Sequence, residues 1–473
     1  MINYQTNNNF FAQGLYHSGQ KSVPVQLTGN YKSFSDDPVD IQVWSEENDA
    51  IEVFDSSMRY PYSIWFDGKT EMGESLWMMG IRPYQITGSN HLDGSVDIFI
   101  KGNLEATSKP NQTIHVHAIT SQSPVILPEW RYIQSYDGTT TRLGDEVERN
   151  GINWENNQGK AKLIDYYEFV NADKNDRHTS IKIRTNSLFL TIIPIIETEI
   201  KAILFQLPRF LYEDLNLLSF IGRKRIVCTE ATARISDDNS NSYAYARYRT
   251  WGGFYNLPSE QNFLRPLIHP RLLQQGVFSN LISTYKASPY KKIIDRTIPY
   301  ILTSYEDGYV ETHLVNAYAA LESMVDGIGS FYEQDHLLGK RSFKHLSSKI
   351  KDLITQEILD IDIANGISKK IPELNRRSFL DRLLFLLNIQ GVNTSLVWPP
   401  NIDESKEFQE IITRRNLLIH TGLIDRGDLC DFDLNRVQKL VEIWILKLLD
   451  CPDEKVNLLS LYRDAPINKI LHY

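Results

Sequence analysis

The sequence contains little cysteine, which narrows the classes of protein to which it can belong. Its 473 residues include only three cysteines, Cys228, Cys430 and Cys451, which are widely spaced and form no CxxC pair. A disulfide framework needs an even set of cysteines and a cysteine-based zinc site needs closely spaced ones, so neither is indicated. The low cysteine content fits a location in the reducing cytoplasm. We also expect no metal ion and no cofactor.

Long hydrophobic runs are also missing. The most apolar stretch, Ser187–Ile196, is interrupted by Pro194, and it is shorter than the roughly 20 residues with which a helix crosses a bilayer. The first eleven residues are polar and rich in asparagine, unlike a signal peptide. These features predict a protein that is neither embedded in a membrane nor secreted.

The chain has no excess of positive charge. It contains 50 lysine and arginine residues against 59 aspartate and glutamate residues, a net charge of −9. A dedicated non-specific nucleic-acid binder is usually basic, so any nucleic-acid site here must be a local basic patch. The sequence also lacks a phosphate-binding glycine loop of the Walker or dinucleotide type and a GxSxG nucleophile elbow.

Short alternating hydrophobic runs fill the first half of the chain. Val23, Val25 and Leu27 alternate with other residues, and Ile64–Phe66 leads into Asp67–Gly68, a dipeptide typical of a turn. Such runs, bounded by glycine, asparagine and aspartate, are typical of antiparallel strands. We predict a β-rich domain with a sandwich-like architecture over residues 1–250, so the fold class is α+β.

The second half has the period of α-helices. We predict a helical bundle over residues 300–473, joined to the β domain by a connecting region at 251–299 that contains one helix at 270–285. The first helix of the bundle has its apolar stripe from Val310 to Val325, and we expect it to end at Gly327. The other helices are predicted near residues 342–354, 372–391, 404–420 and after Asp433.

The predicted helix at 404–420 ends in an unusual way. Its apolar stripe, which contains Phe408, Ile411 and Ile412, continues onto Arg415. A charged side chain therefore lies where a core residue is expected, or at the edge of that stripe. A buried arginine is costly unless it is paired or meets an anion, so Arg415 is a candidate functional residue.

Two further polar residues follow Arg415 on the same helix. Asn416 and His420 are four residues apart and share a face, and Gly422 is suited to end the helix in the left-handed conformation. A guanidinium is suited to binding phosphate, and an imidazole can transfer protons near neutral pH. Arg415, Asn416 and His420 together could cleave a phosphodiester without a metal ion. A structural interpretation stays open, in which Arg415 pairs with Glu322 or Asp425 and His420 caps helix carbonyls.

The residues around this group resemble a known signature. The segment Ile412–Gly422, ITRRNLLIHTG, resembles the RNxxxH signature of HEPN-domain ribonucleases. The segment Asn316–Met324, NAYAALESM, is similar to a helix of the ApeA-type HEPN subgroup. The β-rich half, which begins around Gly14–Leu15 and Val23–Gly29, resembles the β-rich domain that precedes HEPN in ApeA-like anti-phage proteins. The resemblance covers nearly the whole chain and is specific in the motif and the domain order.

This resemblance implies an RNA endonuclease that acts as a homodimer, in which two RNxxxH helices form one cleft. Arg415, Asn416 and His420 match the family's catalytic residues, Arg414 is within the permitted spacing of a second arginine, and Glu322 matches an acidic position that orients the motif. The RNA 2′-hydroxyl would attack its own adjacent phosphate, so DNA should be inert. The implied role is anti-phage defence by abortive infection, with tRNA or another structured RNA as target and a phage-derived protein as trigger.

Several basic residues could guide RNA to such a site. Lys369, Lys370, Arg376 and Arg377 form two short runs within the helical half and are predicted, together with Arg414, to contact RNA. The alternative is that such runs are solvated surface.

Tyrosine and arginine also alternate in the β half. The strand-like segment at 243–249 would place Tyr243, Tyr245, Arg247 and Arg249 on one face. That face could stack RNA bases or simply face solvent.

Two rival functions remain. The helical half could be a non-catalytic HEPN module for dimerisation or RNA binding, which weak RNA binding without turnover would favour. Alternatively, the β half could be the functional part, as a carbohydrate-, ligand- or protein-binding domain with the helices as a scaffold.

Overall fold

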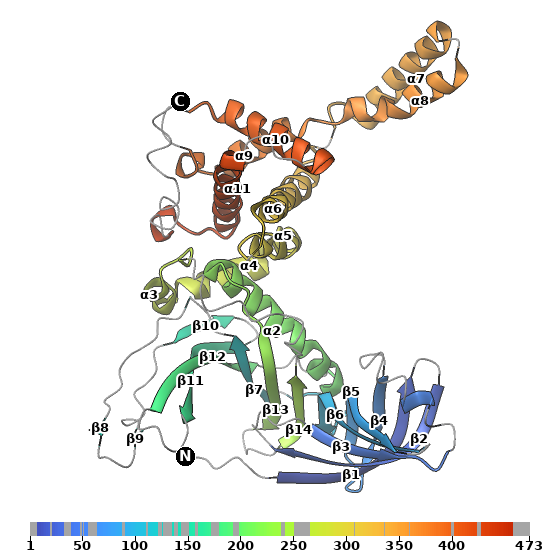
Figure 1. The fold of residues 1–473 in the computed structure, drawn as a ribbon, viewed down its shortest axis with the longest axis vertical. Helices are drawn as coiled ribbons and strands as arrows, with labels where there is room; N and C mark the ends of the chain where they lie inside the picture. The colour runs from blue at the N-terminus through green and yellow to red at the C-terminus, as the bar shows by residue number, and fades with distance from the viewer. Residues whose placement is uncertain are drawn as a thin grey trace. The chain divides into compact units, whose positions relative to one another are not determined.

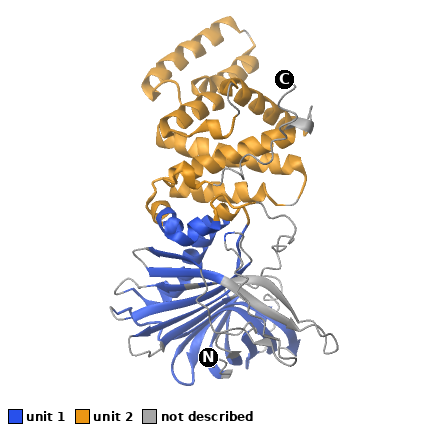
Figure 2. Cartoon of the chain, turned by 90° about the vertical axis from the view of Figure 1, so that its left-hand side faces the viewer, with its two compact units in different colours: residues 1–219, 225–263, 270–282 blue, residues 220–224, 264–269, 283–473 orange. Residues whose placement is uncertain are grey.

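The structure is a computed structural model of the full chain, whose ribbon is drawn in Figure 1. It describes the chain except for residues 1–6, 19–20, 33–38, 48–49, 51, 55–63, 88–89, 110–111, 122–124, 126–134, 137–140, 143–150, 157–158, 172–178, 193–197, 238–241, 250–264, 307, 335, 359, 399–401, 423–426 and 457–473. Two compact units are distinguished in Figure 2, a β unit of residues 1–219, 225–263 and 270–282 and a helical unit of residues 220–224, 264–269 and 283–473.

One antiparallel sheet of twelve strands dominates the β unit. The strands follow the order β10-β11-β12-β7-β13-β14-β6-β3-β2-β1-β4-β5, and β8 (Ser135–Tyr136) pairs separately with β9 (Thr141–Arg142). The bounds of the twelve strands are β1 (Asn7–Ser18), β2 (Lys21–Lys32), β3 (Val39–Trp44), β4 (Ile64–Thr70), β5 (Ser75–Thr87), β6 (His91–Gly102), β7 (Gln112–Ser121), β10 (Ile152–Asn156), β11 (Gly159–Asn171), β12 (Thr179–Ile192), β13 (Cys228–Asp237) and β14 (Ser242–Arg249).

Half of this sheet closes on itself. Strand β5 also pairs along β6, so β6, β3, β2, β1, β4 and β5 form a ring. Strand β6 can join the ring to the rest of the sheet because one of its edges pairs first with β3 and then with β14. The antiparallel β prediction is confirmed, but the sandwich-like architecture is wrong, since the strands belong to one partly closed sheet.

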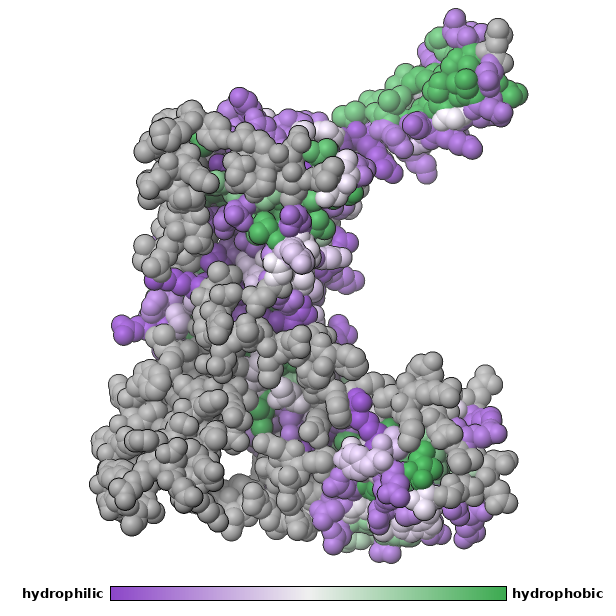
Figure 3. All heavy atoms as spheres, viewed as in Figure 1, coloured by the Kyte–Doolittle hydropathy of each residue, from purple (hydrophilic) through white to green (hydrophobic). Residues whose placement is uncertain are grey.

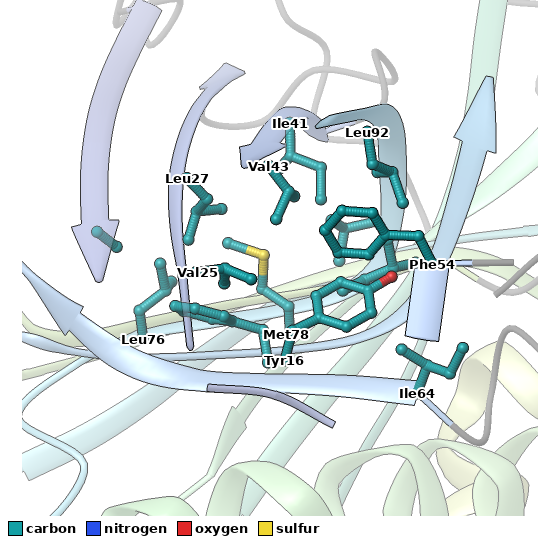
Figure 4. Close-up of a cluster of buried hydrophobic side chains, with 14 of the residues drawn as sticks. Tyr16, Val25, Leu27, Ile41, Val43, Phe54, Ile64, Leu76, Met78 and Leu92 are labelled. Carbon is teal, nitrogen blue, oxygen red and sulfur yellow. The ribbon is translucent and has the colours of Figure 1, made fainter. Parts of the chain in front are cut away.

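The core of the ring follows from the alternation of its strands. In β3, Val39, Ile41 and Val43 are buried while Asp40 and Gln42 between them are exposed. Figure 4 shows such inward side chains packed together, with the ring of Phe54 laid against them. The rings of Tyr16 and Phe54 meet edge to face with centroids 5.3 Å apart. Period-two burial thus places one face of each strand in the apolar interior.

The turn expected at Asp67–Gly68 does not occur, because β4 continues through it to Thr70. Gly68 pairs with Gly14 of β1, and a Cβ atom on either glycine would lie less than 3 Å from the ring of Phe66. These glycines therefore provide space for an aromatic ring that lies over the sheet.

The β half also contains a long helix that is not among the predicted elements. Helix α2 (Ile200–Gly222) has 23 residues and includes Pro208. Within the β unit, Trp154 of β10 donates to the carboxylate of Asp214 over 2.9 Å, and Tyr248 of β14 donates to the carbonyl of Leu204 over 2.6 Å. Helix α2 thus packs on the sheet along both its early and its late turns.

The remaining helices follow from residue 270 onward. They are α3 (Pro270–Leu272), the π-helical turn η3 (Leu273–Val277), α4 (Phe278–Ala287), α5 (Lys291–Thr303), α6 (Val310–Phe331), α7 (Lys340–Glu357), α8 (Ile361–Lys370), the 3-10 turn η4 (Ile371–Asn375), α9 (Phe379–Gln390), the 3-10 turn η5 (Thr394–Leu396), α10 (Glu404–Thr421), α11 (Gly427–Leu448) and the 3-10 turn η6 (Asp453–Lys455). Helix α6 contacts α5, α9, α10 and α11. The stripe from Leu314 to Val325 in α6 and that from Val437 to Leu448 in α11 are buried, as predicted.

The predicted end of α6 at Gly327 is wrong, since the helix continues to Phe331. A Cβ atom on Gly327 would lie 2.8 Å from Cγ1 of Ile293 in α5. Glycine at this position therefore allows two helices to approach closely and does not end one of them.

Helices α7 and α8 form a hairpin that buries almost nothing. No residue of α7 is buried, and Ala364 is the one buried residue of α8. Figure 3 shows hydrophobic residues along one side of the hairpin. The exposed large hydrophobic residues of the two helices are Leu346, Leu353, Ile361, Ile363 and Ile367.

A buried ion pair joins the segment after α2 to α11 within the helical unit. Arg223 donates from Nε and Nη2 to the two carboxylate oxygens of Glu442, over 2.7 and 2.5 Å. The two side chains are 7% and 1% exposed, and Tyr305 also donates to Glu442. Burial and the nearby carboxylate raise the pKa of Tyr305 well above its ordinary value.

We predict that Glu442→Gln destabilises the helical unit by about 3–5 kcal/mol, because the guanidinium of Arg223 is left buried without its counter-charge. Chemical denaturation followed by far-UV circular dichroism measures the loss. The control Asp352→Asn changes an exposed carboxylate of α7 and should alter stability by at most about 0.5 kcal/mol. Equal unfolding midpoints for the two variants would contradict the prediction.

Candidate active site at the end of α10

Hydrogen bonds of neighbouring residues cap helix α10 at both ends. The Asp403 carboxylate accepts a hydrogen bond from the backbone N–H of Lys406 over 3.2 Å, which caps the first turn. At the other end Gly422 adopts φ +67°, and its N–H donates to the carbonyl of Leu418 over 2.9 Å. The predicted glycine cap is thus confirmed, and it fixes His420 in the last turn of the helix.

Arg415 lies at the edge of the buried stripe of α10, with 24% of its side chain exposed. Its Nη2 donates to the carboxylate of Glu322 on α6, and its Nη1 donates to Oδ1 of Asn416 over 2.9 Å. The structure therefore brings together three of the four residues predicted to be catalytic. The contact with Glu322 is also the one that the structural interpretation of Arg415 requires.

Burial and a nearby positive charge shift the pKa of the Glu322 carboxyl group in opposite directions. Burial raises the pKa of its carboxyl group above the ordinary value, and the guanidinium of Arg415 counteracts part of this effect. Its side chain is still 37% exposed. The carboxyl is thus reachable from solvent while it holds Arg415.

The fourth predicted residue, His420, lies one turn beyond Asn416. Both side chains are exposed to solvent, whereas Leu418 between them is buried. An imidazole in this place is accessible to a substrate or to another protein chain. Ile419 beside it is also 45% exposed, which leaves an apolar side chain in the same turn.

A cavity of about 280 Å³ adjoins Arg415 between α6, α9 and α10. Its polar lining includes Arg415, Asn416 and Glu322, and its other walls are mainly apolar. Phe379 of α9 and Gln409 of α10 also line it. Nothing in the sequence pattern marks these last two residues as part of a site, because only the packing of α9 against α10 places them here. His420 does not line the cavity.

The neighbouring Arg414 points to a different helix. Its Nε and Nη2 donate to the two carboxylate oxygens of Asp433 on α11, over 2.6 and 2.8 Å, and its Nη1 donates to Glu410 over 3.3 Å. Only 2% of the Asp433 side chain is exposed. This bidentate contact favours a structural role for Arg414 over the RNA contact predicted from the sequence.

The other residues predicted to contact RNA lie next to α9. Lys369 and Lys370 end α8, Arg376 follows η4, and all three are exposed, whereas Arg377 is half-buried. Arg377 donates from Nε to the carbonyl of His336 over 3.4 Å.

The aromatic and basic face predicted at 243–249 is interrupted by a buried residue, and the side chain of Arg249 lies outside the described residues. Arg247 is 2% exposed and pairs with Glu230 of β13, with its Nε 2.8 Å from the carboxylate. Tyr245 packs against the core of the ring. Both predicted alternatives, base stacking and a solvent-facing surface, therefore fail at Arg247.

The β unit has its own hollow, a groove of about 800 Å³ over β1, β2, β3, β5 and β6. Tyr84 on its wall is 62% exposed and donates to Asp40 over 3.2 Å. Gln42 of β3 donates to Asp93 over 2.9 Å. The groove combines an exposed aromatic ring with carboxylate and amide groups.

Comparison with models of protein families, with curated proteins and with solved structures finds no match for this chain. Within the described part of the chain, no three histidine, cysteine or acidic side chains are grouped so that they could hold a metal ion. Among the same residues, no helix is both long and apolar enough to cross a membrane.

We predict that substitution by alanine lowers the free energy of unfolding by different amounts at Arg414 and at Arg415. Arg414→Ala leaves the buried Asp433 carboxylate unpaired and should destabilise the helical unit by about 3–5 kcal/mol. Arg415→Ala leaves a partly exposed Glu322, and because solvent screens that charge the loss should be about 1 kcal/mol or less. Urea denaturation of both variants measures the difference, and equal losses would mean that Arg414 is not the residue that anchors α10.

Proposed function

We propose that the chain is a metal-independent RNA endonuclease of the HEPN type, which acts as a homodimer. The observation that carries this proposal is the group formed at the end of α10 and on α6. There the guanidinium of Arg415 is oriented by Glu322 and Asn416 at the edge of a cavity, and the imidazole of His420 is exposed one turn away. These groups can bind a phosphate and transfer protons.

In the proposed reaction, the 2′-hydroxyl of a ribose attacks the adjacent phosphorus and the bond to the 5′-oxygen of the next nucleotide breaks. His420 acts as the base that removes the hydroxyl proton, as the acid that protonates the leaving oxygen, or as both across a dimer. Arg415 stabilises the negative charge that develops on the phosphoryl oxygens. The products are a 2′,3′-cyclic phosphate and a 5′-hydroxyl end.

A dimer would bring together a guanidinium and an imidazole that lie on different sides of the helix in a single copy. Residues 415 and 420 are five apart, which on an ideal helix separates them by about 140° around the axis. A second copy would place another guanidinium and another imidazole against the same phosphate. The exposed Ile419 in the motif turn offers an apolar contact for such an interface.

Under this proposal the protein acts in anti-phage defence by abortive infection, and the β unit restrains the nuclease until a phage-derived protein binds. The groove over β1, β2, β3, β5 and β6 is the candidate surface for that trigger. The same groove favours a second candidate function, in which the β unit binds a ligand and the helical unit only dimerises or binds RNA. Ligand binding together with RNA binding but no RNA turnover would indicate this second function.

We predict that Arg415→Ala and His420→Ala each slow RNA cleavage by about a hundredfold or more, because each removes a group that acts in the transition state. Cleavage is followed with an end-labelled RNA in EDTA, and the products should carry a cyclic phosphate. An oligonucleotide with one 2′-deoxyribose at the cleavage site should resist cleavage there. Lys406→Gln on the same helix is the control. Undiminished cleavage by folded variants would rule out the assignment of Arg415 and His420.

We predict a smaller effect for Glu322, which acts through Arg415 as a positioning residue. Glu322→Gln keeps the shape of the side chain but removes its charge, so kcat should fall by about tenfold with KM nearly unchanged. The kcat ratio of wild type to variant should decrease as the pH falls through the pKa of Glu322, because the wild-type carboxyl then also becomes neutral. A ratio that does not vary with pH would show that the charge of Glu322 is not involved.

A further inference from the structure

Six cationic side chains gather at the base of the α7–α8 hairpin. Two begin α7, two end α8 and two follow η4; we call these residues the basic collar, Lys340, Arg341, Lys369, Lys370, Arg376 and Arg377. The chain carries a net charge of −9, yet residues 340–377 contain nine lysine or arginine residues and five acidic ones. The collar is thus a local basic patch on an acidic protein.

A buried asparagine holds the two halves of the collar together. The Asn375 side chain accepts from the N–H of Leu338 over 2.8 Å and donates to the carbonyl of the same residue over 3.0 Å. The carbonyl of Asn375 accepts from the N–H of Leu337, also over 2.8 Å. These bonds fix the segment just before α7 beside the segment that carries Arg376 and Arg377.

In the described part of the chain, the charges of the collar are not neutralised by acidic partners. Among the described residues none of its six side chains forms an ion pair, whereas Arg414, Arg415 and Arg436 of the same unit all do. Lys369 and Lys370 are favoured at a helix C-terminus by the helix dipole. Lys340 and Arg341 lie in the first turn of α7, where that dipole disfavours cations and where no acidic residue compensates. Such an arrangement is more easily explained by an anionic ligand.

The collar leads directly to the cavity beside Arg415. Arg377 is followed by Ser378, whose side chain accepts from the N–H of Asp381 at the start of α9, and then by Phe379. Ser378 and Phe379 both line that cavity. Phe379 is half-buried, so part of its ring is accessible to a ligand. The cationic surface and the partly aromatic cavity are therefore continuous along the chain.

We propose that the collar and this cavity together bind single-stranded RNA, an inference that rests on the proposed nuclease function. The collar holds backbone phosphates, and the cavity takes the unpaired base of the nucleotide next to the cleaved phosphate. At about 280 Å³, the cavity is just below the roughly 300–1,000 Å³ typical of ligand pockets and suits one base better than a whole nucleotide. A paired base could not enter it, which excludes the interior of a duplex.

The experiment measures Kd of a fluorescent single-stranded RNA at several salt concentrations, with the full chain carrying His420→Ala. Arg376→Gln/Arg377→Gln and Lys340→Gln/Arg341→Gln should each weaken binding by about tenfold and reduce the slope of log Kd against log salt by roughly 1.4, about 0.7 per phosphate contact. The matched control is Lys292→Gln/Lys406→Gln, which removes two exposed lysines of the same unit outside the collar and should change neither quantity.

The cavity is tested separately through Phe379. Phe379→Ala should weaken binding of the single strand and leave the salt slope unchanged, because stacking releases no counterions. Phe379→Tyr keeps an aromatic ring and should bind like the parent, which controls for damage to the packing of α9.

Four results distinguish the RNA path from the nuclease function. The proposed RNA path would be overturned if the collar variants had the same Kd and salt slope as the control Lys292→Gln/Lys406→Gln. It would also be overturned if the control lost as much RNA affinity as the collar variants. RNA cleavage by the wild type combined with collar-independent binding would reject the path but keep the nuclease function. Collar-dependent binding with no cleavage by the wild type would reject the nuclease function and keep the path.

Discussion

The bidentate contact between Arg414 and Asp433 is the constraint on which the proposed site depends. It anchors α10 to α11 through a carboxylate that is 2% exposed, so α10 cannot rotate without leaving that charge unpaired. Successive residues of a helix point about 100° apart. With Arg414 directed to α11, Arg415 is directed to α6, where it meets Glu322. A structural arginine thus determines where its neighbour, the proposed functional arginine, lies.

The pairing of Arg415 also limits what one copy of the motif can do. Glu322 offsets part of the positive charge of the guanidinium, so a single Arg415 presents a weakened cation to a phosphate. Phosphoryl transfer depends mainly on positioning and on stabilising negative charge. Under the proposed function, a second copy must therefore supply further positive charge while Glu322 keeps Arg415 in position. Activity would then depend on assembly, which suits an enzyme that must be restrained.

The sequence predicted the features of the fold that depend only on residues near one another in the chain. The stripes of α6 and α11 follow from the 3.6-residue period, and the cap at Gly422 follows from its position after the last helical turn. Gly68 and Gly327 were misinterpreted because their role depends on what lies opposite, Gly14 across the sheet and Ile293 across a helix. Helix α2 contains Pro208, and a proline in the interior of a helix usually breaks or kinks it. The local sequence therefore does not predict one continuous helix there.

The candidate site shows the same division between local and tertiary information. The RNxxxH pattern lies within two helical turns and could be found from the sequence alone, whereas Asp433 and Phe379 become neighbours of α10 only when α9 and α11 pack against it. The net charge of the chain also does not show where positive charge is available to a ligand. A sum of −9 treats every cation alike, but Arg414 and Arg415 form ion pairs within the protein, whereas no collar side chain forms an ion pair among the described residues. Under the proposed RNA path, a phosphate chain would meet the charges that form no ion pair, and the buried side chain of Asn375 helps to fix where they lie because it bonds to Leu338 just before α7.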